Sequence, residues 1–285
     1  MINVLVTGGN GQMGRCLDHI KSKHSSIKFL FLSKDKLDIT IYKSLLNFIQ
    51  EHEVDVIINC AAYTKVDKAE EEPANAKIIN VLGVKNLIKI SETFHIKLIH
   101  ISTDYVFDGY SVNNLKEEDK TNPLGVYGKT KLEGENLVLD SNSEAIIIRT
   151  SWLFSPFGNN FVKTILKRSH LKQKISVIND QRGKPTYGID LAETIIKLIH
   201  SSKSFKNKIY HFSNKGVTTW YDFAKSIIKL SGSKCDLAPI KTENYPLKGL
   251  RPKNLDLNTE LIETTLNLQI PNWKDSLNEC LKMIK

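Results

Sequence analysis

Three side chains of the sequence, Thr103, Tyr127 and Lys131, have the potential to take part in one proton transfer. Tyr127 and Lys131 lie four residues apart in the segment YGKTK, and on a helix this spacing places both on one face. A tyrosine with its ordinary pKa of about 10 is a poor partner for proton transfer near neutrality, and a neighbouring ammonium lowers that pKa. Thr103 follows the apolar run IHIS, where a strand would end, so its hydroxyl could share a substrate oxygen with the phenol. By itself the Tyr–Lys spacing also fits an ordinary surface helix, and the neighbouring features have to decide between the two interpretations.

A glycine-rich segment near the start of the chain could bind a phosphate. It reads TGGNGQMG (7–14), and its glycines fit two dinucleotide-binding spacings, Gly9-Gly11-Gly14 and Gly8-Gly11-Gly14. Glycine permits a tight turn and a close approach of the backbone to a pyrophosphate. A helix that begins directly after the turn adds free N–H groups and a positive dipole. The segment therefore predicts a nicotinamide dinucleotide site, the alternative being a purely structural turn.

The end of the second predicted strand bears on which dinucleotide would bind. A carboxylate there would bind the ribose 2′-hydroxyl and repel a 2′-phosphate. The chain has Ser33 and Lys34 instead, with Asp35 one position later. The hydroxyl and the cation favour NADPH, while Asp35 leaves NADH open.

The elements that must position these residues follow from alternating apolar and amphipathic segments. Strands are predicted at the short apolar runs Ile2–Thr7, Phe29–Leu32, Val54–Asn59, Lys97–Ser102 and Ala145–Arg149. Between them, helices are predicted to begin near Gly11, Thr40, Asn75 and Tyr127. This alternation is typical of an α/β fold with a Rossmann-like, doubly wound parallel sheet, whose binding crevice lies at the carboxyl ends of the strands.

The second half of the chain predicts a smaller C-terminal α/β substrate-binding region. Its expected elements are helices near Phe161–His170, Leu191–Ser201 and Trp220–Ser231 and a strand at Lys208–Ser213. We assign residues 1–150 and about 185–203 to the dinucleotide-binding domain, and about 151–184 and 204–285 to the smaller region.

Composition narrows the classes of partner. The 40 lysines and arginines exceed the 31 aspartates and glutamates, but they are scattered and interleaved with acids, which favours a solvated surface over nucleic-acid binding. No apolar run approaches the roughly 20 residues needed to cross a bilayer, and the first residues read as a buried strand instead of a signal peptide. The histidine and cysteine spacings predict no metal site. We expect a cytoplasmic protein that binds neither nucleic acid nor a membrane.

Longer segments resemble those of extended short-chain dehydrogenases/reductases, and in finer detail the dTDP-4-dehydrorhamnose reductase family. The resemblance covers nearly the whole chain, and STDYVFDG (102–109), RTSWLF (149–154) and NDQRGKPT (179–186) are far more specific than the general superfamily pattern. It implies NAD(P)H-dependent reduction of the C4 keto group of dTDP-4-dehydro-6-deoxy-L-mannose (dTDP-4-dehydrorhamnose) to dTDP-L-rhamnose, for surface polysaccharide biosynthesis. The partner is then a dTDP-linked 4-keto-6-deoxy-sugar, and a homodimer is left open.

The resemblance also implies a role for individual residues. Tyr127 would donate the proton, Lys131 would tune it and bind the nicotinamide ribose with support from Asn80, and Thr103 would bind the substrate oxygen. The cofactor set then comprises Gly8, Asn10, Gly11, Gln12, Met13, Gly14, Ser33, Lys34, Asp38, Ile39, Ala61, Ala62, Tyr63, Thr64, Asn80, Tyr127 and Lys131. The substrate set comprises Val66, Thr103, Asp104, Tyr105, Trp152, Asn160 and Arg251, the arginine being a candidate for the diphosphate.

The sequence departs from the family pattern at a few positions. Arg182 and Lys184 make a loop near the substrate unusually basic, and Leu255 stands where the pattern RPxxS has serine. Arg15 stands where some relatives have an acid that binds Mg²⁺, so no metal is predicted.

Two other functions are compatible with a dinucleotide-binding fold. One is a related nucleotide-sugar epimerase, reductase or dehydratase, but a dehydratase would carry a pair of acids next to the threonine, and only Asp104 is adjacent. The other is a non-catalytic NADP-binding regulatory protein. The intact set of Thr103, Tyr127 and Lys131 argues against it.

Overall fold

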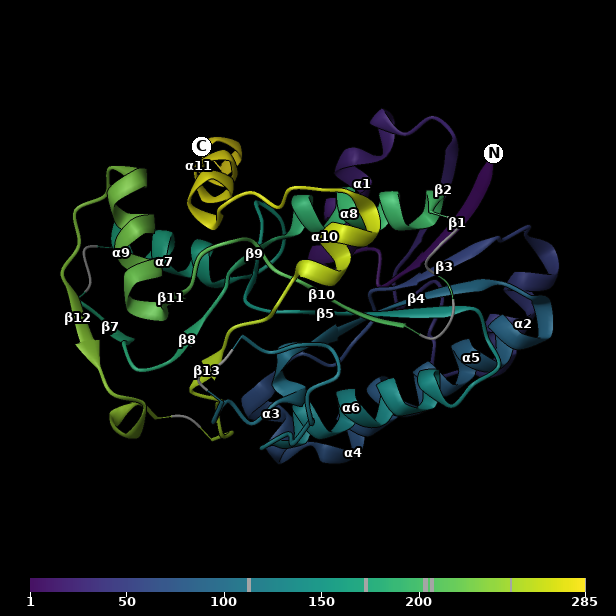
Figure 1. Cartoon of the computed structure of the whole chain (residues 1–285), viewed down its shortest axis with the longest axis horizontal. Coiled ribbons are helices and arrows are strands. Elements are labelled where there is room, and N and C mark those ends of the chain that lie inside the picture. Colours follow the sequence, from purple (N-terminus) through teal and green to yellow (C-terminus); the bar gives the residue numbers. More distant parts are fainter. Residues whose placement is uncertain (112–113, 172–173, 202–204, 206–207, 247, 285) are drawn as a thin grey trace.

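A computed structural model describes residues 1–111, 114–171, 174–201, 205, 208–246 and 248–284. Within these residues the core is a parallel sheet in the order β10–β5–β4–β3–β1–β2 (Figure 1). Its strands are β1 (Ile2–Thr7), β2 (Ile27–Leu32), β3 (Val56–Asn59), β4 (Lys97–Thr103), β5 (Ala145–Thr150) and β10 (Lys208–Phe212). The predicted α/β fold class is confirmed, and every strand predicted in the first 150 residues lies in this sheet.

The strand order reverses at β1. This strand pairs with β2 on one side and with β3 on the other, with Thr7 opposite both Leu32 and Asn59. The chain therefore leaves β1 in one direction and crosses back over it to reach β3. The carboxyl ends of β1 and β3 border the crevice that such a reversal creates, which is where ligands bind in open α/β sheets.

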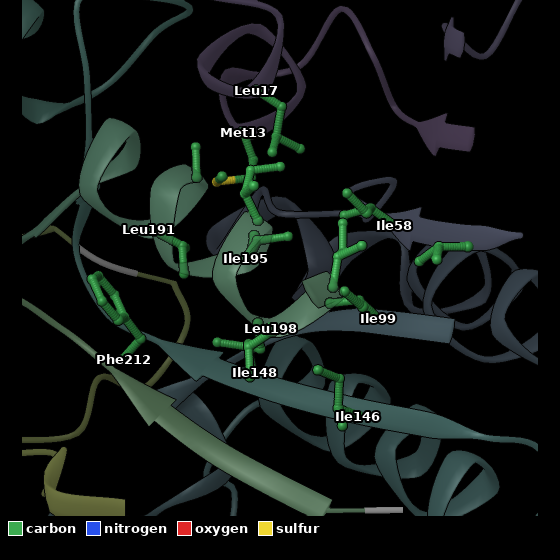
Figure 2. Close-up of a cluster of buried hydrophobic side chains, with 14 of the residues drawn as sticks. Met13, Leu17, Ile58, Ile99, Ile146, Ile148, Leu191, Ile195, Leu198 and Phe212 are labelled. Atoms are coloured by element: carbon green, nitrogen blue, oxygen red, sulfur yellow. The ribbon is translucent and has the colours of Figure 1, made fainter. Parts of the chain in front are cut away.

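Helices cover both faces of the sheet because successive strand residues point to opposite faces. On one face, α1 (Gln12–Ile20) and α8 (Gly188–His200) pack on Ile58, Ile146 and Ile148 (Figure 2). On the other face, α2 (Tyr42–Glu51), α5 (Gly83–Phe94) and α6 (Val126–Leu139) pack on the intervening side chains, such as Ile57, Leu98 and Ile147. The sheet is therefore buried on both sides, as a parallel sheet requires.

A smaller region lies beside the sheet (Figure 1). Its helices are α7 (Phe161–His170), α9 (Trp220–Ser231) and α11 (Trp273–Ile284), and they enclose a separate apolar cluster that includes Phe154, Phe223 and Trp273. Its short strands pair as β7 (Ile175–Ile178) with β12 (Leu237–Ile240), as β6 (Leu153–Phe154) with β9 (Thr186–Tyr187), and as β11 (Thr218–Thr219) with β8 (Arg182–Gly183) and β13 (Asn254–Leu255). The chain crosses between this region and the sheet more than once.

Strand β10 corrects the predicted domain boundary. The prediction that residues 204–285 belong to the smaller region is wrong for this strand, because it pairs in parallel with β5 as part of the central sheet. Its Tyr210 and Phe212 are buried in the cluster beneath α8, together with Ile262 of α10 (Glu260–Leu266). Apolar side chains on a five-residue strand can be buried in either region, so the sequence pattern does not reveal which sheet it joins. The rest of the domain division stays a prediction.

Close backbone contacts place α6 against its neighbours. A Cβ atom added at Gly128 would lie 2.3 Å from the Tyr105 carbonyl oxygen, and one at Gly134 would lie 2.5 Å from that of Asn80. Tyr105 belongs to a short 3₁₀ helix, η3 (Asp104–Val106), and Asn80 to a π-helical turn, η2 (Ile78–Leu82). The two glycines therefore let α6 approach both segments closely, which places Tyr127 beside the end of β4.

A buried ion pair joins α6 to β5. Glu135 accepts hydrogen bonds from Nε of Arg149 at 3.1 Å and from its Nη2 at 2.7 Å, and the two side chains are 0% and 3% exposed. The guanidinium also donates to the Glu117 carbonyl oxygen at 3.2 Å. Because neither charge reaches water, each depends on the other for compensation.

Replacing Glu135 with Gln should therefore lower the free energy of unfolding by about 3–5 kcal/mol, since Arg149 would remain buried without its countercharge. The matched control is Asp18→Asn, which breaks the Lys21–Asp18 pair, whose side chains are 53% and 50% exposed. We expect the control to change stability by less than about 1 kcal/mol. Urea denaturation measures both, and equal losses for the two variants would contradict the role given to burial.

Candidate active site

A pocket opens at the carboxyl ends of β1 and β3. Nine of the predicted cofactor residues line it, namely Gly8, Asn10, Gly11, Ser33, Lys34, Asp38, Ile39, Ala61 and Ala62. Four further lining residues, Leu37, Thr40, Cys60 and Ile79, were not predicted. Leu37 and Thr40 flank the predicted pair within the segment LDIT, and Cys60 precedes the two alanines, so adjacency along the chain is the signal that could have found them.

The glycine turn brings two backbones together. Gly8 has a φ of +63°, and a Cβ atom there would lie 2.8 Å from the Ala61 backbone nitrogen. A Cβ atom at Gly14 would lie 2.5 Å from the Gly9 carbonyl oxygen, so α1 begins tightly against the turn. No side chain of the described residues caps α1 at Gly11, which leaves its first N–H groups available to an anion.

Gln12 and Met13, at the start of α1, have side chains in different surroundings. The Gln12 side-chain amide nitrogen is buried and has no hydrogen-bond partner among the described residues. A buried donor beside an uncapped helix end suits a phosphate oxygen. The Met13 side chain instead packs into the core beneath α8 (Figure 2), so the contact with the cofactor that the sequence predicts would have to come from its backbone.

After the end of β2, the Lys34 ammonium lies near the carboxylate of Asp38. The Lys34 ammonium lies 3.8 Å from an Asp38 carboxylate oxygen, and its side chain is 74% exposed. Asp35 accepts a hydrogen bond from the Ser33 hydroxyl. The second strand is therefore followed by a cation at the pocket wall that lies near Asp38, while Asp35, the next residue along the chain, is bonded to Ser33.

Thr103 and Tyr127 meet at the end of β4. Tyr127 is the second residue of α6, and its hydroxyl lies close enough to that of Thr103 for the threonine to lower its pKa. The Tyr105 ring packs edge-on against the Tyr127 ring, with the centroids 5.6 Å apart. The structure thus brings together the two hydroxyl groups that the sequence predicts to act on one substrate oxygen.

The pKa of Tyr127 moves in the direction opposite to the prediction. Burial raises this pKa to about 12, the neighbouring Thr103 hydroxyl opposes the rise, and Asp104 adds to it. The prediction that Lys131 lowers the Tyr127 pKa is wrong for this geometry. The Lys131 side chain is directed elsewhere, since its Nζ donates to the Ile101 carbonyl oxygen at 2.7 Å. At neutral pH the phenol holds its proton and can act as an acid.

Lys131 is itself buried, with 2% of its surface exposed. Burial lowers its pKa to about 8, while Glu135 and Cys60 act in the opposite direction. Its Nζ also lies 3.2 Å from Nε2 of His100, a residue that the sequence interpretation did not single out. His100 stands inside an otherwise apolar strand, and a polar residue at such a position is the signal that was missed.

Asn80 supports α6 from a distance. Its side-chain oxygen accepts from the Tyr63 backbone nitrogen at 2.8 Å, and its nitrogen donates to the Tyr63 carbonyl oxygen at 3.2 Å and to the Thr130 hydroxyl at 3.1 Å. Asn80 therefore ties the loop after β3 to the residue that precedes Lys131, and it bonds to neither the lysine nor the pocket. Tyr63 and Thr64 likewise lie outside the lining of the pocket.

Asp104 is a buried acid beside the two hydroxyl groups. One carboxyl oxygen accepts a hydrogen bond from Thr103 at 3.1 Å, and the other is buried with no partner among the described residues. Burial raises the pKa of this carboxyl to about 8, so it is protonated at neutral pH. A neutral carboxyl group can both donate to and accept from a sugar hydroxyl.

An aromatic stack stands at the entrance to the smaller region. Trp152 adopts a φ of +43°, and its ring stacks on that of Trp220 with the centroids 3.6 Å apart. A left-handed backbone is costly for a side chain of this size, so the surrounding packing must hold it. Trp220, the first residue of α9, was not among the predicted substrate residues.

The predicted phosphate ligand Arg251 has partners of its own. Its Nη2 lies 2.9 Å from a carboxylate oxygen of Asp67, next to Val66. Val66 and Asp67 line a second, open pocket, together with Lys65, Lys68, Glu71, Pro246 and Lys248. Arg251 is therefore paired with an acid in this structure, and the lysines Lys68 and Lys248 of the neighbouring pocket are likewise paired with Glu72 and Glu71.

Two expectations about the substrate side need correction. The Asn160 carboxamide caps α7 by accepting from the Lys163 backbone nitrogen at 3.2 Å, and it donates to the carbonyl oxygens of Ser155 and Phe157, so its hydrogen bonds hold the loop instead of a substrate. Lys184 does not make the loop basic, because it is buried in an ion pair with Asp256. Leu255 is buried in an apolar cluster, which accounts for the missing serine.

The raised pKa of Asp104 should appear in the stability of the protein. Because the folded state holds this proton more tightly than the unfolded chain, stability falls as pH rises from about 4 towards about 8. Asp104→Asn removes this titration. The variant should gain more than about 1 kcal/mol relative to the wild type between pH 5 and pH 8. Urea denaturation across this range measures the difference, and parallel pH curves for the two proteins would contradict the assignment.

Comparison with known proteins agrees with this geometry. The family model described as RmlD substrate binding domain matches residues 2–285. A dTDP-4-dehydrorhamnose reductase of Aggregatibacter actinomycetemcomitans is 38% identical, with 97% of each chain covered. A solved dTDP-4-dehydrorhamnose reductase of Clostridium acetobutylicum superposes with a TM-score of 0.94 at 38% identity, and one of Bacillus anthracis in complex with NADP with 0.93 at 37% identity, each covering 99% of both chains. The chain therefore belongs to the RmlD substrate binding domain family, as its resemblance to dTDP-4-dehydrorhamnose reductases predicts.

Proposed function

We propose that this protein is an NADPH-dependent reductase that converts the C4 keto group of dTDP-4-dehydro-6-deoxy-L-mannose into the hydroxyl group of dTDP-L-rhamnose. The observation that carries the proposal is the pairing of Thr103 with a protonated Tyr127 at the carboxyl end of β4. This pair lies on the same edge of the sheet as the glycine turn. The names of the curated and solved relatives give the substrate class.

The pocket behind the glycine turn fits a dinucleotide. The uncapped start of α1 and the unpaired Gln12 amide nitrogen can donate hydrogen bonds to the pyrophosphate. Gly8, which has no side chain, allows the glycine turn to lie close against Ala61 on the neighbouring strand end. Lys34 suits a 2′-phosphate, and the Bacillus anthracis relative was solved with NADP. Bound NADPH supplies the hydride for the reduction.

The side chains of this chain supply the proton and the positioning. Tyr127 gives its phenolic proton to the C4 oxygen as the carbonyl is reduced, and Thr103 donates a hydrogen bond to the same oxygen. The protonated Asp104 carboxyl, whose Oδ2 has no hydrogen-bond partner among the described residues, binds a neighbouring sugar hydroxyl. Trp152, stacked on Trp220, forms a wall for the sugar, and Arg251 contributes a cation for the diphosphate.

The two alternative functions are less consistent with this site. A dehydratase needs a second acid beside Asp104, and the next residue is Tyr105, whose ring packs on Tyr127. A non-catalytic regulatory protein would not need a threonine and a tyrosine hydroxyl beside each other near a dinucleotide pocket. Incubation of the pure protein with NADPH and the dTDP-4-keto sugar, followed by loss of NADPH absorbance, distinguishes a reductase from both.

Tyr127→Phe should remove the transferable proton and leave the pocket intact. We expect kcat to fall by about 10²–10⁴-fold, with NADPH affinity nearly unchanged. Tyr110→Phe is the matched control, because Tyr110 is 75% exposed and should retain full activity. A Tyr127→Phe variant that keeps more than about a tenth of the wild-type kcat would exclude the phenol as the acid.

Lys34→Glu tests the preference for NADPH. The change replaces a cation with an anion at the pocket wall. At an exposed site, each charge removed or added should change the free energy of NADPH binding by about 1 kcal/mol. NADPH affinity should fall several-fold to tens of fold, NADH affinity should stay nearly constant, and the loss should shrink as salt rises. Lys36→Glu makes the same charge change outside the pocket lining and serves as the control. Equal losses for both cofactors would show that Lys34 does not read the 2′-phosphate.

Three further expectations from the sequence stay predictions: the absence of nucleic-acid binding, the cytoplasmic location and the homodimer. Of the helices in the described part of the chain, none has the length and apolar character to cross a membrane.

A further inference from the structure

One carboxylate fills a group of converging hydrogen-bond donors beside the site. Asp67 lies in the first turn of α3 (Val66–Glu71). Its Oδ1 accepts from the backbone nitrogens of Lys248 at 3.2 Å and Gly249 at 3.1 Å, and its Oδ2 accepts from Nη2 of Arg251 at 2.9 Å. Three donors from one short loop therefore meet on a single side chain of a helix that is distant in the sequence.

These donors have the character of an anion site. Successive backbone N–H groups that point at one acceptor form a concave site for anions, and a guanidinium adds a full charge that matches phosphate oxygens. Arg251 is held in place, because its Nη1 donates to the Gly249 carbonyl oxygen at 3.4 Å and only 12% of its side chain is exposed. We call the N–H groups of Lys248 and Gly249 and the guanidinium of Arg251 the anion nest.

The anion nest lies beside the start of α6, close to the proposed acid. A Cβ atom added at Gly125, directly before this helix, would lie 3.9 Å from the Leu250 carbonyl oxygen. The Arg251 guanidinium also opposes the rise that burial causes in the pKa of Tyr105, whose ring packs on that of Tyr127. A ligand whose sugar reaches Tyr127 could therefore place a diphosphate at the nest.

The Asp67 side chain is free to leave the nest. It is 44% exposed, so its carboxylate borders solvent, where water would replace the lost hydrogen bonds. A phosphate group cannot share these donors with the carboxylate, because two negative charges at such a distance repel each other. The binding of a phosphate at the nest thus requires Asp67 to turn away.

We propose that Asp67 is an internal substitute for the substrate diphosphate, filling the anion nest in the unliganded protein and leaving it when a sugar linked to a nucleoside diphosphate binds. Asp67 then determines the affinity for the nucleotide part of the ligand and takes no part in the proton transfer. This inference deepens the proposed function and rests on it for the identity of the diphosphate.

The exchange affects the substrate and the product alike, because reduction at C4 leaves the diphosphate unchanged. Each of these ligands has to displace the carboxylate in order to bind, and the return of Asp67 to the nest favours release. The interaction is the same in the ground state and in the transition state. Removing the carboxylate should therefore lower KM for the sugar nucleotide without raising kcat.

A neighbouring acid provides a matched control. Glu71 lies on the same helix, lines the same open pocket and is exposed to a similar extent, 46%. Its partner is the ammonium of Lys248, which lies outside the nest. Asp67→Asn and Glu71→Gln thus remove one negative charge each from one pocket, and only the first acts on the nest. The asparagine oxygen can still accept from the two backbone N–H groups, which preserves the loop.

Calorimetric titration with dTDP, in the absence of NADPH, measures the effect on the whole protein. Asp67→Asn should bind dTDP about three- to thirtyfold more tightly than the wild type, and Glu71→Gln should differ from it by less than about twofold. Thermal unfolding establishes that both variants fold. Equal gains would mean that the net charge of the pocket sets the affinity. Unchanged or weaker binding by Asp67→Asn would mean that the carboxylate only orients Arg251, and either result would overturn the proposal.

A crystal structure of the wild type with dTDP tests the exchange directly, whatever the stability of the variants. Phosphate oxygens should lie within hydrogen-bond distance of the Lys248 and Gly249 backbone nitrogens, with Asp67 turned towards solvent. A diphosphate bound elsewhere, with Asp67 still on Arg251, would refute this inference and leave the proposed function standing. A wild-type protein that does not bind dTDP would refute both the inference and the substrate class of the proposed function.

Discussion

The seating of α6 is the constraint on which the rest of the site depends. This helix carries both Tyr127 and Lys131, and its approach to η2 and η3 is possible only because Gly128 and Gly134 have no side chain. The Glu135–Arg149 pair then fixes its rotation, because a bidentate contact away from water tolerates little movement. An ion pair one turn beyond Lys131 thus determines where the phenol meets Thr103.

Burial gives the site a common electrostatic character. It raises the pKa values of Tyr127 and Asp104 and lowers those of Lys131 and His100, so each of these shifts favours the uncharged form of its group. In a buried site of this kind, hydrogen bonds and charges act more strongly on a negative charge that develops on a substrate oxygen, because little solvent screens them.

The sequence predicted the architecture and the pocket well because both depend on local patterns. Strand ends, the glycine turn and the Tyr–Lys spacing are visible in short segments, and the structure places nine predicted cofactor residues around one pocket. The failures concern side-chain direction. Met13 faces the core, Asn160 caps a helix and Lys131 turns to Ile101, and none of these orientations is encoded in the residue type. His100 was missed because its partners, Asn59 and Lys131, come from distant parts of the chain.

Strand β10 has a consequence for how the chain must fold. The central sheet is completed by residues 208–212, which the ribosome delivers long after the first 150 residues have emerged. Until then β5 is an open edge with unpaired backbone groups, and the apolar face that α8 covers is bare. Residues 1–150 therefore leave one sheet edge unpaired and one apolar face uncovered, although they contain the dinucleotide pocket and Tyr127. In a nascent chain of that length, this edge and this face are the surfaces open to aggregation until α8 and β10 cover them.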